Sequence, residues 1–359
     1  MKYTLLATLA TALFISCSQN ENREINYVFD KSKAKNCEMI EKCILEDVCL
    51  DMGDDAAKFT LPQLFLSGDD MLVSSMDDVL RFGKDGKMKN RIGEVGRAAG
   101  EYVEMLDWCL DPSGEHVEIM DTKSIYSYDL SGKFVSKQPL PISAVAFVKT
   151  SQHYWFATGR NGYDAFTLFR TDHQLDDIKK YNEAEAVPIP VKEKNFGKGT
   201  WLTYKESFTH DVLRIEDGEP TLTHRFSFKG LEIPEGMFTG DMMDMIRKMS
   251  KQPYAMIHTY LENDNLVFML VQEYRKGLEE EPVNYWWVID KEKQEDVVLS
   301  IPEEYMDMYG NPQTLTGKGV LFLVSFQNPQ QDADSSDTYS PHVIKVDLTN
   351  IGSADISGL

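Results

Sequence analysis

A repeat in the first third of the chain limits the folds open to it. Two stretches 46 residues apart match without a gap, and each consists of short apolar runs separated by turn residues. Such runs are typical of β-strands joined by tight turns. A strand-rich repeat of roughly 40 to 50 residues is typical of the blades of a β-propeller. The matched residues are Gly68 and Gly114, Val73 and Ile119, Val79 and Ile125, Phe82 and Tyr128, and Gly86-Lys87 and Gly132-Lys133.

Weaker units of the same kind follow in the rest of the chain. The spacing between units widens twice, which indicates insertions at residues 237–249 and 328–339. We therefore expect an all-β fold, a six-bladed β-propeller with four-stranded antiparallel blades, that occupies residues 37–359 as one domain. The four further units are predicted at residues 146–181, 201–228, 257–301 and 314–347.

Residues 37–50 are open to two interpretations. Ile40, Ile44 and Val48 recur at helical spacing. A propeller must also close its ring, however, because an open blade edge leaves backbone hydrogen-bond donors unpaired. We therefore expect residues 42–50 to form an N-terminal strand that joins the last blade and closes the ring, with a helical turn just before it.

The N-terminus has the pattern of a secretory signal. Lys2 precedes an apolar run from Leu5 to Ile15, which is too short to span a bilayer as a helix. The run ends in Ser16-Cys17, which resembles a bacterial lipobox. Residues 1–16 are thus predicted to be a lipoprotein signal peptide, Cys17 the acylated mature N-terminus, and residues 17–36 a flexible tether. The alternative is an ordinary signal peptide with an incidental cysteine.

This N-terminal signal predicts where the protein is located. A lipid on Cys17 would anchor the protein to a membrane without spanning it. We therefore expect a protein of the bacterial cell envelope, bound to the outer membrane through its N-terminal lipid and placed on the periplasmic or the surface side.

The charge of the chain excludes one class of partner. Acidic residues outnumber basic residues by 58 to 37, which gives a net charge of −21. A general nucleic-acid binder needs a basic face, so nucleic acid is not an expected partner. The same charge favours a neutral or cationic ligand. The cysteines beyond Cys17 fit no zinc spacing and are expected to be buried free thiols, with a disulfide to Cys109 as the alternative; they are Cys37, Cys43, Cys49 and Cys109.

The segment that links the first two repeats carries a family resemblance. Residues 92–102 read IGEVGRAAGEY, which resembles the glycine-rich link of six-bladed β-propeller lipoproteins from Bacteroides-like bacteria, relatives of TolB-like and NHL-type propellers. Glu94 and Ala98-Ala99 depart from the family pattern. The resemblance implies fold and location, and it implies no activity. We expect a structural crossing between blades, with a phosphate cradle as the alternative. The matching residues are Gly93, Gly96, Gly100, Glu101 and Tyr102.

No catalytic pattern is present in the sequence. The 7 histidines show no local zinc spacing, and no nucleophile elbow of the G-x-S-x-G type occurs. We therefore expect no cofactor and no metal, and predict a binding module for a glycan, a peptide or a partner protein of the envelope. The alternatives are a hydrolase or lyase that uses channel carboxylates, with or without a divalent metal, and a structural subunit of an envelope complex.

The candidate ligand site lies near the first insertion. Residues 237–249 are rich in methionine and predict a short helix capped by Thr239 or Asp241, whose thioethers suit an adaptable contact surface. The alternative is a lid that covers apolar blade ends. The second insertion, residues 328–339, predicts a loop, with calcium binding as an alternative. The candidate ligand-binding residues are Trp201, Tyr204, Met242, Met243 and Met245.

Overall fold

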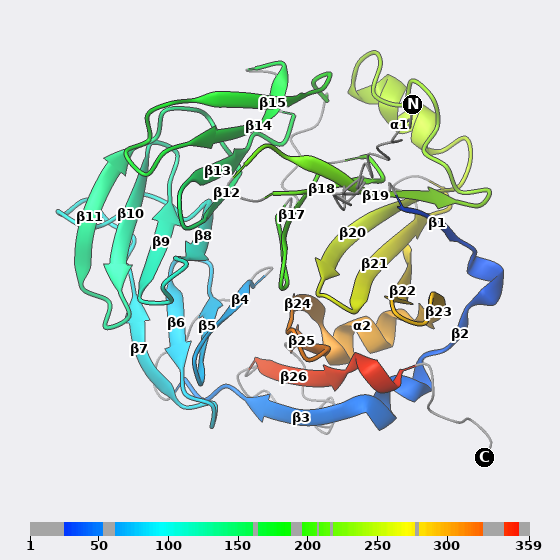
Figure 1. The fold of residues 1–359 in the computed structure, drawn as a ribbon, viewed down its shortest axis with the longest axis horizontal. Helices are drawn as coiled ribbons and strands as arrows, with labels where there is room; N and C mark the ends of the chain where they lie inside the picture. Colours follow the sequence, from blue (N-terminus) through cyan, green and yellow to red (C-terminus); the bar gives the residue numbers. More distant parts are fainter. Residues whose placement is uncertain are drawn as a thin grey trace, which may run out of the picture.

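Six small sheets arranged around a central axis make up the computed structural model of the protein (Figure 1). Each sheet is one blade, in which the four strands of a repeat follow one another in antiparallel order. The predicted six-bladed β-propeller is confirmed. The structure describes residues 25–52, 62–160, 164–187, 196–206, 208–215, 218–276, 280–325 and 341–351.

The first two blades are the two halves of the sequence repeat. Their matched glycines, such as Gly86 and Gly132, have φ angles of 79° and 87°, a left-handed conformation that favours glycine in tight turns. The strands of blades 1 to 3 are β4 (Leu64–Ser67), β5 (Asp70–Ser74), β6 (Val79–Phe82) and β7 (Met88–Ile92); β8 (Asp107–Leu110), β9 (His116–Met120), β10 (Ser124–Asp129) and β11 (Phe134–Pro139); and β12 (Ala146–Lys149), β13 (Tyr154–Ala157), β14 (Phe166–Thr171) and β15 (Lys179–Glu183).

The second half of the ring follows the predicted units closely. Blade 6 receives only three strands from its own part of the chain, as far as the structure describes it. The strands of blades 4 to 6 are β16 (Phe196–Lys198), β17 (Leu202–Lys205), β18 (Asp211–Arg214) and β19 (Thr221–Phe228); β20 (Tyr254–Glu262), β21 (Leu266–Tyr274), β22 (Val283–Asp290) and β23 (Glu295–Ile301); and β24 (Asn311–Leu315), β25 (Val320–Ser325) and β26 (His342–Asp347).

The fourth strand of blade 6 comes from the N-terminal part of the chain. Strand β3 (Ile44–Cys49) pairs antiparallel with β26, and Val48 lies opposite Val343. A 3₁₀ helix, η2 (Cys37–Cys43), precedes the strand. The predicted ring closure and the helical turn before it are both confirmed. The cysteines of this region and Cys109 are free, and Cys49, unlike the other three, is exposed.

The expected tether is wrong for residues 25–36. Strand β1 (Ile25–Phe29) adds parallel to the outer edge of blade 4, and β2 (Lys35–Asn36) adds to the outer edge of blade 5 (Figure 1). The 3₁₀ helix η1 (Lys31–Lys33) connects them. The physical reason is that β19 and β23 are the last strands of their blades and offer backbone groups along their outer edges, and Phe29 becomes fully buried against Phe228. Residues 1–24, including Cys17, lie outside the described residues.

Large side chains fill the space between neighbouring blades. The aromatic triplets 154–156 and 285–287 alternate between the two faces of their strands, and all six side chains are buried. Trp286 packs in the cluster between blades 5 and 6, while Trp287 packs with Phe29 and Phe226 between blades 4 and 5. These residues therefore form core, as expected.

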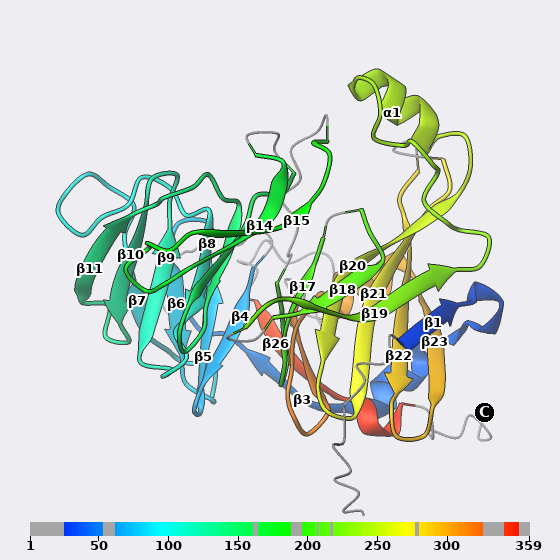
Figure 2. The same ribbon diagram turned by 45° about the horizontal axis from the view of Figure 1, so that its top comes forward.

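The connections differ in length between the two faces of the ring. In an antiparallel blade, the turns after strands one and three leave at one end, and all other connections leave at the opposite end. The first group are tight turns such as residues 68–69 and 130–133. The second group include helix α1 (Met242–Met249), which stands out from the blades in Figure 2, and helix α2 (Glu303–Tyr309), which the sequence did not predict. We call these the short-turn face and the long-loop face.

The predicted helix in the first insertion is confirmed. Asp241 caps α1, since its carboxylate accepts a hydrogen bond from the backbone N–H of Asp244 at 2.9 Å. The second insertion lies largely outside the described residues. Within the described part of the chain, no helix combines the length and the apolar character needed to cross a membrane.

Candidate ligand-binding site in the central channel

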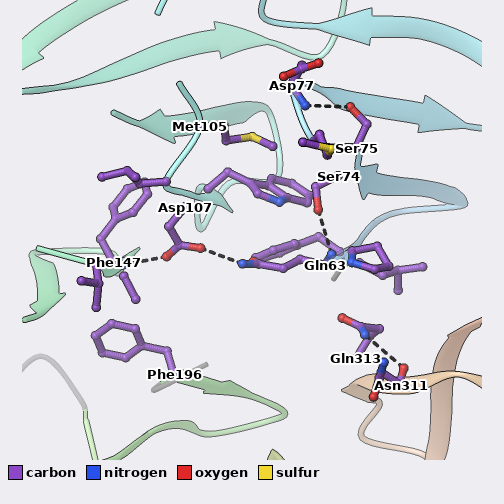
Figure 3. Close-up of a pocket in the computed structure, with 18 of the residues that line it drawn as sticks. Gln63, Ser74, Ser75, Asp77, Met105, Asp107, Phe147, Phe196, Asn311 and Gln313 are labelled. Atoms are coloured by element: carbon purple, nitrogen blue, oxygen red, sulfur yellow. Dashed lines mark hydrogen bonds between the residues drawn. The ribbon is translucent and has the colours of Figure 1, made fainter. Parts of the chain in front are cut away.

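A cavity of about 460 Å³ lies on the axis of the propeller, and the first strands of all six blades contribute to its wall. In five of these strands the lining residues lie at or near the beginning of the strand. The beginnings of the first strands point towards the long-loop face. Figure 3 shows side chains from several blades that converge on this space. The volume is within the range of small-molecule and side-chain binding sites.

Two of the first strands carry a β-bulge at the point where they border the cavity. In β20 the pairing with β21 passes from Ile257 to Thr259 and leaves His258 as the extra residue. In β24 it passes from Pro312 to Thr314 and leaves Gln313 as the extra residue. Both extra residues line the cavity. A bulge redirects a side chain at the expense of regular pairing and is often found next to functional sites.

The carboxylate of Asp107 ties three blades together at the cavity wall. One oxygen accepts a hydrogen bond from Gln63 Nε2 at 2.7 Å, and the other accepts one from the backbone N–H of Phe147 at 2.8 Å (Figure 3). These partners belong to blades 1 and 3, while Asp107 begins the first strand of blade 2. The side chain is 8% exposed. The bonds therefore fix the orientation of a buried carboxylate.

The rim of the cavity combines apolar and acidic side chains. Met76 and Val103 line the cavity and are 51% and 67% exposed. Asp77 and Glu104 stand next to them in the chain, also line the cavity and are exposed. Ser75 orders the first part of this rim, because its hydroxyl accepts a hydrogen bond from the backbone N–H of Asp77 at 3.2 Å (Figure 3).

The glycine-rich link holds the second part of the rim in place. Tyr102 is fully buried, and its hydroxyl donates a hydrogen bond to the carbonyl oxygen of Asp77 at 2.5 Å, so that it joins the two parts. Gly93 has a φ of 82° and lies against the ring of Tyr102, where a Cβ atom would collide. Gly96 donates its N–H to the carbonyl of Tyr102, and Glu101 accepts the N–H of Ala98. Gly100 accepts a hydrogen bond from Tyr128. These contacts lie within the link or join it to blades 1 and 2, and its role as a structural crossing stays a prediction.

Among the described residues, the titratable groups of the cavity lining are three carboxylates and the imidazole of His258. The carboxylates are those of Asp77, Glu104 and Asp107, and no lysine or arginine lines the cavity among the described residues. In the described part of the chain, no group of three or more His, Cys, Asp or Glu side chains is placed to hold a metal ion. The arrangement suits a ligand that brings a positive charge or hydrogen-bond donors.

Trp201 and Tyr204 lie away from the cavity lining. Trp201 donates from Nε1 to Asp264 at 3.0 Å, and the guanidinium carbon of Arg214 lies 4.2 Å from the centroid of its ring. Tyr204 is fully buried and donates from its hydroxyl to Glu206 at 2.5 Å. Burial, followed by the negative charge of Glu206, raises the pKa of Tyr204 well above its usual value.

The three candidate methionines divide between the two sides of α1. Met245 is 1% exposed and packs with Met237, Met249 and Tyr254 under the helix. Met242 and Met243 are 48% and 61% exposed. None of the three lines the cavity. The structure thus brings Met245 into a small core of its own, and the role of the other two in ligand contact stays a prediction.

A buried charge cluster, the Glu262 cluster, lies beside Trp201 between blades 4 and 5. The carboxylate of Glu262, 1% exposed, contacts His224 Nε2 at 3.2 Å, Lys291 Nζ at 2.9 Å and Arg214 at 3.5 Å. Burial alone would raise the pKa of Glu262, but the bond to His224 and the charges of His224 and Lys291 hold it at about 2. His224 and Arg214 belong to blade 4 and so join it to Glu262 of blade 5, while Lys291 belongs to blade 5 itself.

Sequence reasoning missed the residues that border the cavity. His258 and Gln313 stand out only when the register of their strands is known, because a bulge leaves no mark in a single sequence. Asp107 offered a signal, since aspartate is depleted in strands and this one begins a buried strand.

Comparisons with known proteins agree with this architecture. A family model described as "Domain of unknown function (DUF4934)" matches residues 56–341. One similar solved structure is a protein from Bacteroides fragilis described as exported, with a TM-score of 0.70 and 16% sequence identity, and the match covers 90% of this chain and 99% of that chain. Another is a member of the DUF4221 family from Bacteroides vulgatus, with a TM-score of 0.58 and 11% sequence identity, and the match covers 84% of this chain and 96% of that chain. No curated protein matches the sequence.

Proposed function

The chain belongs to the DUF4934 family, and from the geometry of its channel we propose that it is a binding module of the bacterial cell envelope whose ligand enters the axial cavity from the long-loop face. The observation that carries this proposal is the pair of bulges at His258 and Gln313. These two bulges lie in the first strands of their blades, and the extra residue of each lines the cavity, which supports a role in binding.

The loops of the long-loop face support the same proposal. The short-turn face is built from short turns between neighbouring strands, whereas the long-loop face carries α1, α2 and the glycine-rich link. Loops on a rigid scaffold are where binding residues concentrate. A glycan, a peptide and a segment of a partner protein are the ligand classes that we propose for this site.

Replacing the bulge residue Gln313 with Trp tests this function. Gln313→Trp is expected to fill the cavity and to weaken ligand binding at least about tenfold, with little change in melting temperature, because the half-buried side chain lies outside the core clusters of the described residues. Binding is measured on an array of oligosaccharides and synthetic peptides. Lys318→Trp, in the exposed turn of the same blade on the short-turn face, is the matched control. Wild-type binding by Gln313→Trp would show that the ligand site lies elsewhere.

The envelope location is part of the proposal. We propose that Cys17 is the lipid-bearing N-terminus of the mature protein, that the lipid attaches it to the outer membrane, and that its relatives are the TolB-like and NHL-type propellers. The support is the apolar run that ends in Ser16-Cys17 together with the glycine-rich link.

Metabolic labelling tests the lipid anchor. Cells that express the full chain are fed an alkyne analogue of palmitate, and label on the purified protein is compared between wild type and Cys17→Ala. We expect near-complete loss of label and release of Cys17→Ala from the membrane fraction, because the thiol is the acylation site. Cys49→Ala, which removes an exposed thiol of the propeller, is the control and should label normally. Equal labelling of wild type and Cys17→Ala would refute the anchor.

A further inference from the structure

We propose that the occupant of the channel cavity is a basic polypeptide segment, with a lysine or arginine side chain inside the cavity and apolar neighbours on the rim formed by Met76 and Val103. This inference rests on the proposed function, namely that the cavity binds a ligand, and it names the chemistry of that ligand.

The first argument is charge. Three carboxylates line the cavity, those of Asp77, Glu104 and Asp107, and the described lining residues include no lysine or arginine. The whole chain carries a net charge of −21, so its field attracts cations over a longer range. An anionic segment would meet the carboxylates of Asp77 and Glu104 at the rim and that of Asp107 inside, whereas a cationic segment meets opposite charge at these three groups.

The second argument is the preorganisation of Asp107. Gln63 Nε2 and the Phe147 backbone N–H both donate to its carboxylate, at 2.7 and 2.8 Å. These two bonds hold the carboxylate in one orientation. A buried carboxylate positioned in this way offers an ammonium or guanidinium group a charge-assisted hydrogen bond.

The third argument is the shape of the apolar wall. Phe65, Phe147 and Phe196 line the cavity around the polar groups. Lysine and arginine carry a charged head on an apolar stem, and such stems pack well along apolar walls while the head reaches a polar partner. Aromatic faces add a cation–π attraction to the charged head. A compact metal ion would use the carboxylates and leave the apolar wall without a role.

The rim distinguishes a polypeptide from a small free cation. Met76 and Val103 expose 51% and 67% of their surface directly beside the cavity, and exposed apolar surface next to a cavity is typical of a binding site for a larger partner. A small amine would leave this surface in water, whereas a peptide chain continues out of the cavity and covers it. Asn311 and Gln313, labelled in Figure 3, add polar groups to the cavity wall, and Gln313 Nε2 donates a hydrogen bond to the carbonyl oxygen of Asn311 at 3.0 Å.

The test uses the full protein on pools of N-acetylated, C-amidated hexapeptides whose third residue is fixed as lysine, arginine, norleucine or glutamate and whose other positions are randomised. An array of neutral and acidic oligosaccharides is probed in parallel. We expect the lysine and arginine pools to bind at least about tenfold more tightly than the norleucine and glutamate pools, because a preoriented carboxylate in a partly dry cavity rewards a cation by this much.

Two variants that make the same change in net charge locate the effect. Asp77→Asn with Glu104→Gln removes two rim carboxylates that are exposed and should leave folding intact. Glu115→Gln with Glu292→Gln removes two exposed carboxylates from the short-turn face. The rim variant should reduce the preference for the basic pools about tenfold, and the control variant should keep it.

Each contrary result refutes the inference. Equal binding of the four pools, preference for the glutamate pool, or an equal loss in the control variant would show that the cavity does not select a basic segment. Binding to oligosaccharides alone, abolished by Gln313→Trp, would overturn the peptide and leave the proposed binding function intact. No binding by any pool or oligosaccharide would overturn both.

Discussion

Removal of residues 1–50 is expected to abolish cooperative folding, whereas removal of residues 1–24 leaves the melting temperature unchanged. Among the described strands, β3 is the only partner of the outer edge of β26, and it lies within the longer deletion. Ile40, Val48 and Leu50 are at most 7% exposed and belong to the two cores on either side of blade 6. Their burial contributes roughly 5 kcal/mol or more, which is comparable with the whole stability of a typical domain.

A variant that lacks residues 1–36 separates closure from the added strands. It keeps β3 but loses β1 and β2, together with the buried ring of Phe29. We expect it to fold cooperatively with a free energy of unfolding lower by about 3 kcal/mol, since one large side chain and two parallel edges are lost. Thermal melts followed by circular dichroism compare the three variants. Indistinguishable melting of the three would contradict the role of residues 25–50.

Replacement of Glu262 with Ala is expected to lower the free energy of unfolding by about 3 to 5 kcal/mol at pH 7. The change leaves Lys291, Arg214 and His224 without the carboxylate that they share, and an uncompensated buried charge is costly. Tyr260 also loses its acceptor, because its hydroxyl donates to Glu262 at 2.8 Å. Chemical denaturation at pH 7 measures the difference.

The same residue predicts a dependence on pH. The pKa of Glu262 is about 2 in the folded protein, against an ordinary glutamate value of 4.5, so its stabilising effect is complete above about pH 4.5 and is lost as the pH falls towards 2. The shift corresponds to a contribution on the order of 3 kcal/mol. Wild type should therefore lose its advantage over Glu262→Gln between these pH values.

An exposed ion pair is the control for the Glu262 cluster. Arg225 donates two hydrogen bonds to Asp211, at 2.9 and 3.1 Å, on the surface of the neighbouring strands of blade 4. Asp211→Asn should change the free energy of unfolding by less than about 1 kcal/mol, because water screens the pair. An effect of Glu262→Ala as small as this would show that the cluster does not join the two blades.

The sequence predicted the blades because each strand obeys local rules. Gly86 and Gly132 recur at the spacing of the repeat because both turns need a residue with a left-handed backbone conformation. This periodicity can be recognised in the sequence without knowing any long-range contact. Closure by β3 followed from a requirement of the ring as a whole. Strands β1 and β2 escaped prediction because a strand added in parallel to an edge is held mainly by backbone bonds, which any residue supplies.

The candidate site was less predictable than the fold. The methionine-rich insertion contains the helix α1 (Met242–Met249), but Met245 packs into the core cluster beneath that helix. The cavity is made of residues such as Gln63, Asp107 and His258, which come from different blades and share no local pattern. They converge because six sheets pack around one axis. No short stretch of the sequence carries a pattern that indicates this packing.

The path of residues 25–50 sets the order in which the ring can assemble. This segment runs along the outside of blades 4, 5 and 6 in turn, so that Tyr27 meets Ser227 across 200 residues and Asp47 meets His342 across 295. Ribosomes make these residues long before the strands of blades 4, 5 and 6 with which they pair. The ring therefore stays open until its final strands have been made, and its folding is slow because nearly every closing contact is distant in sequence.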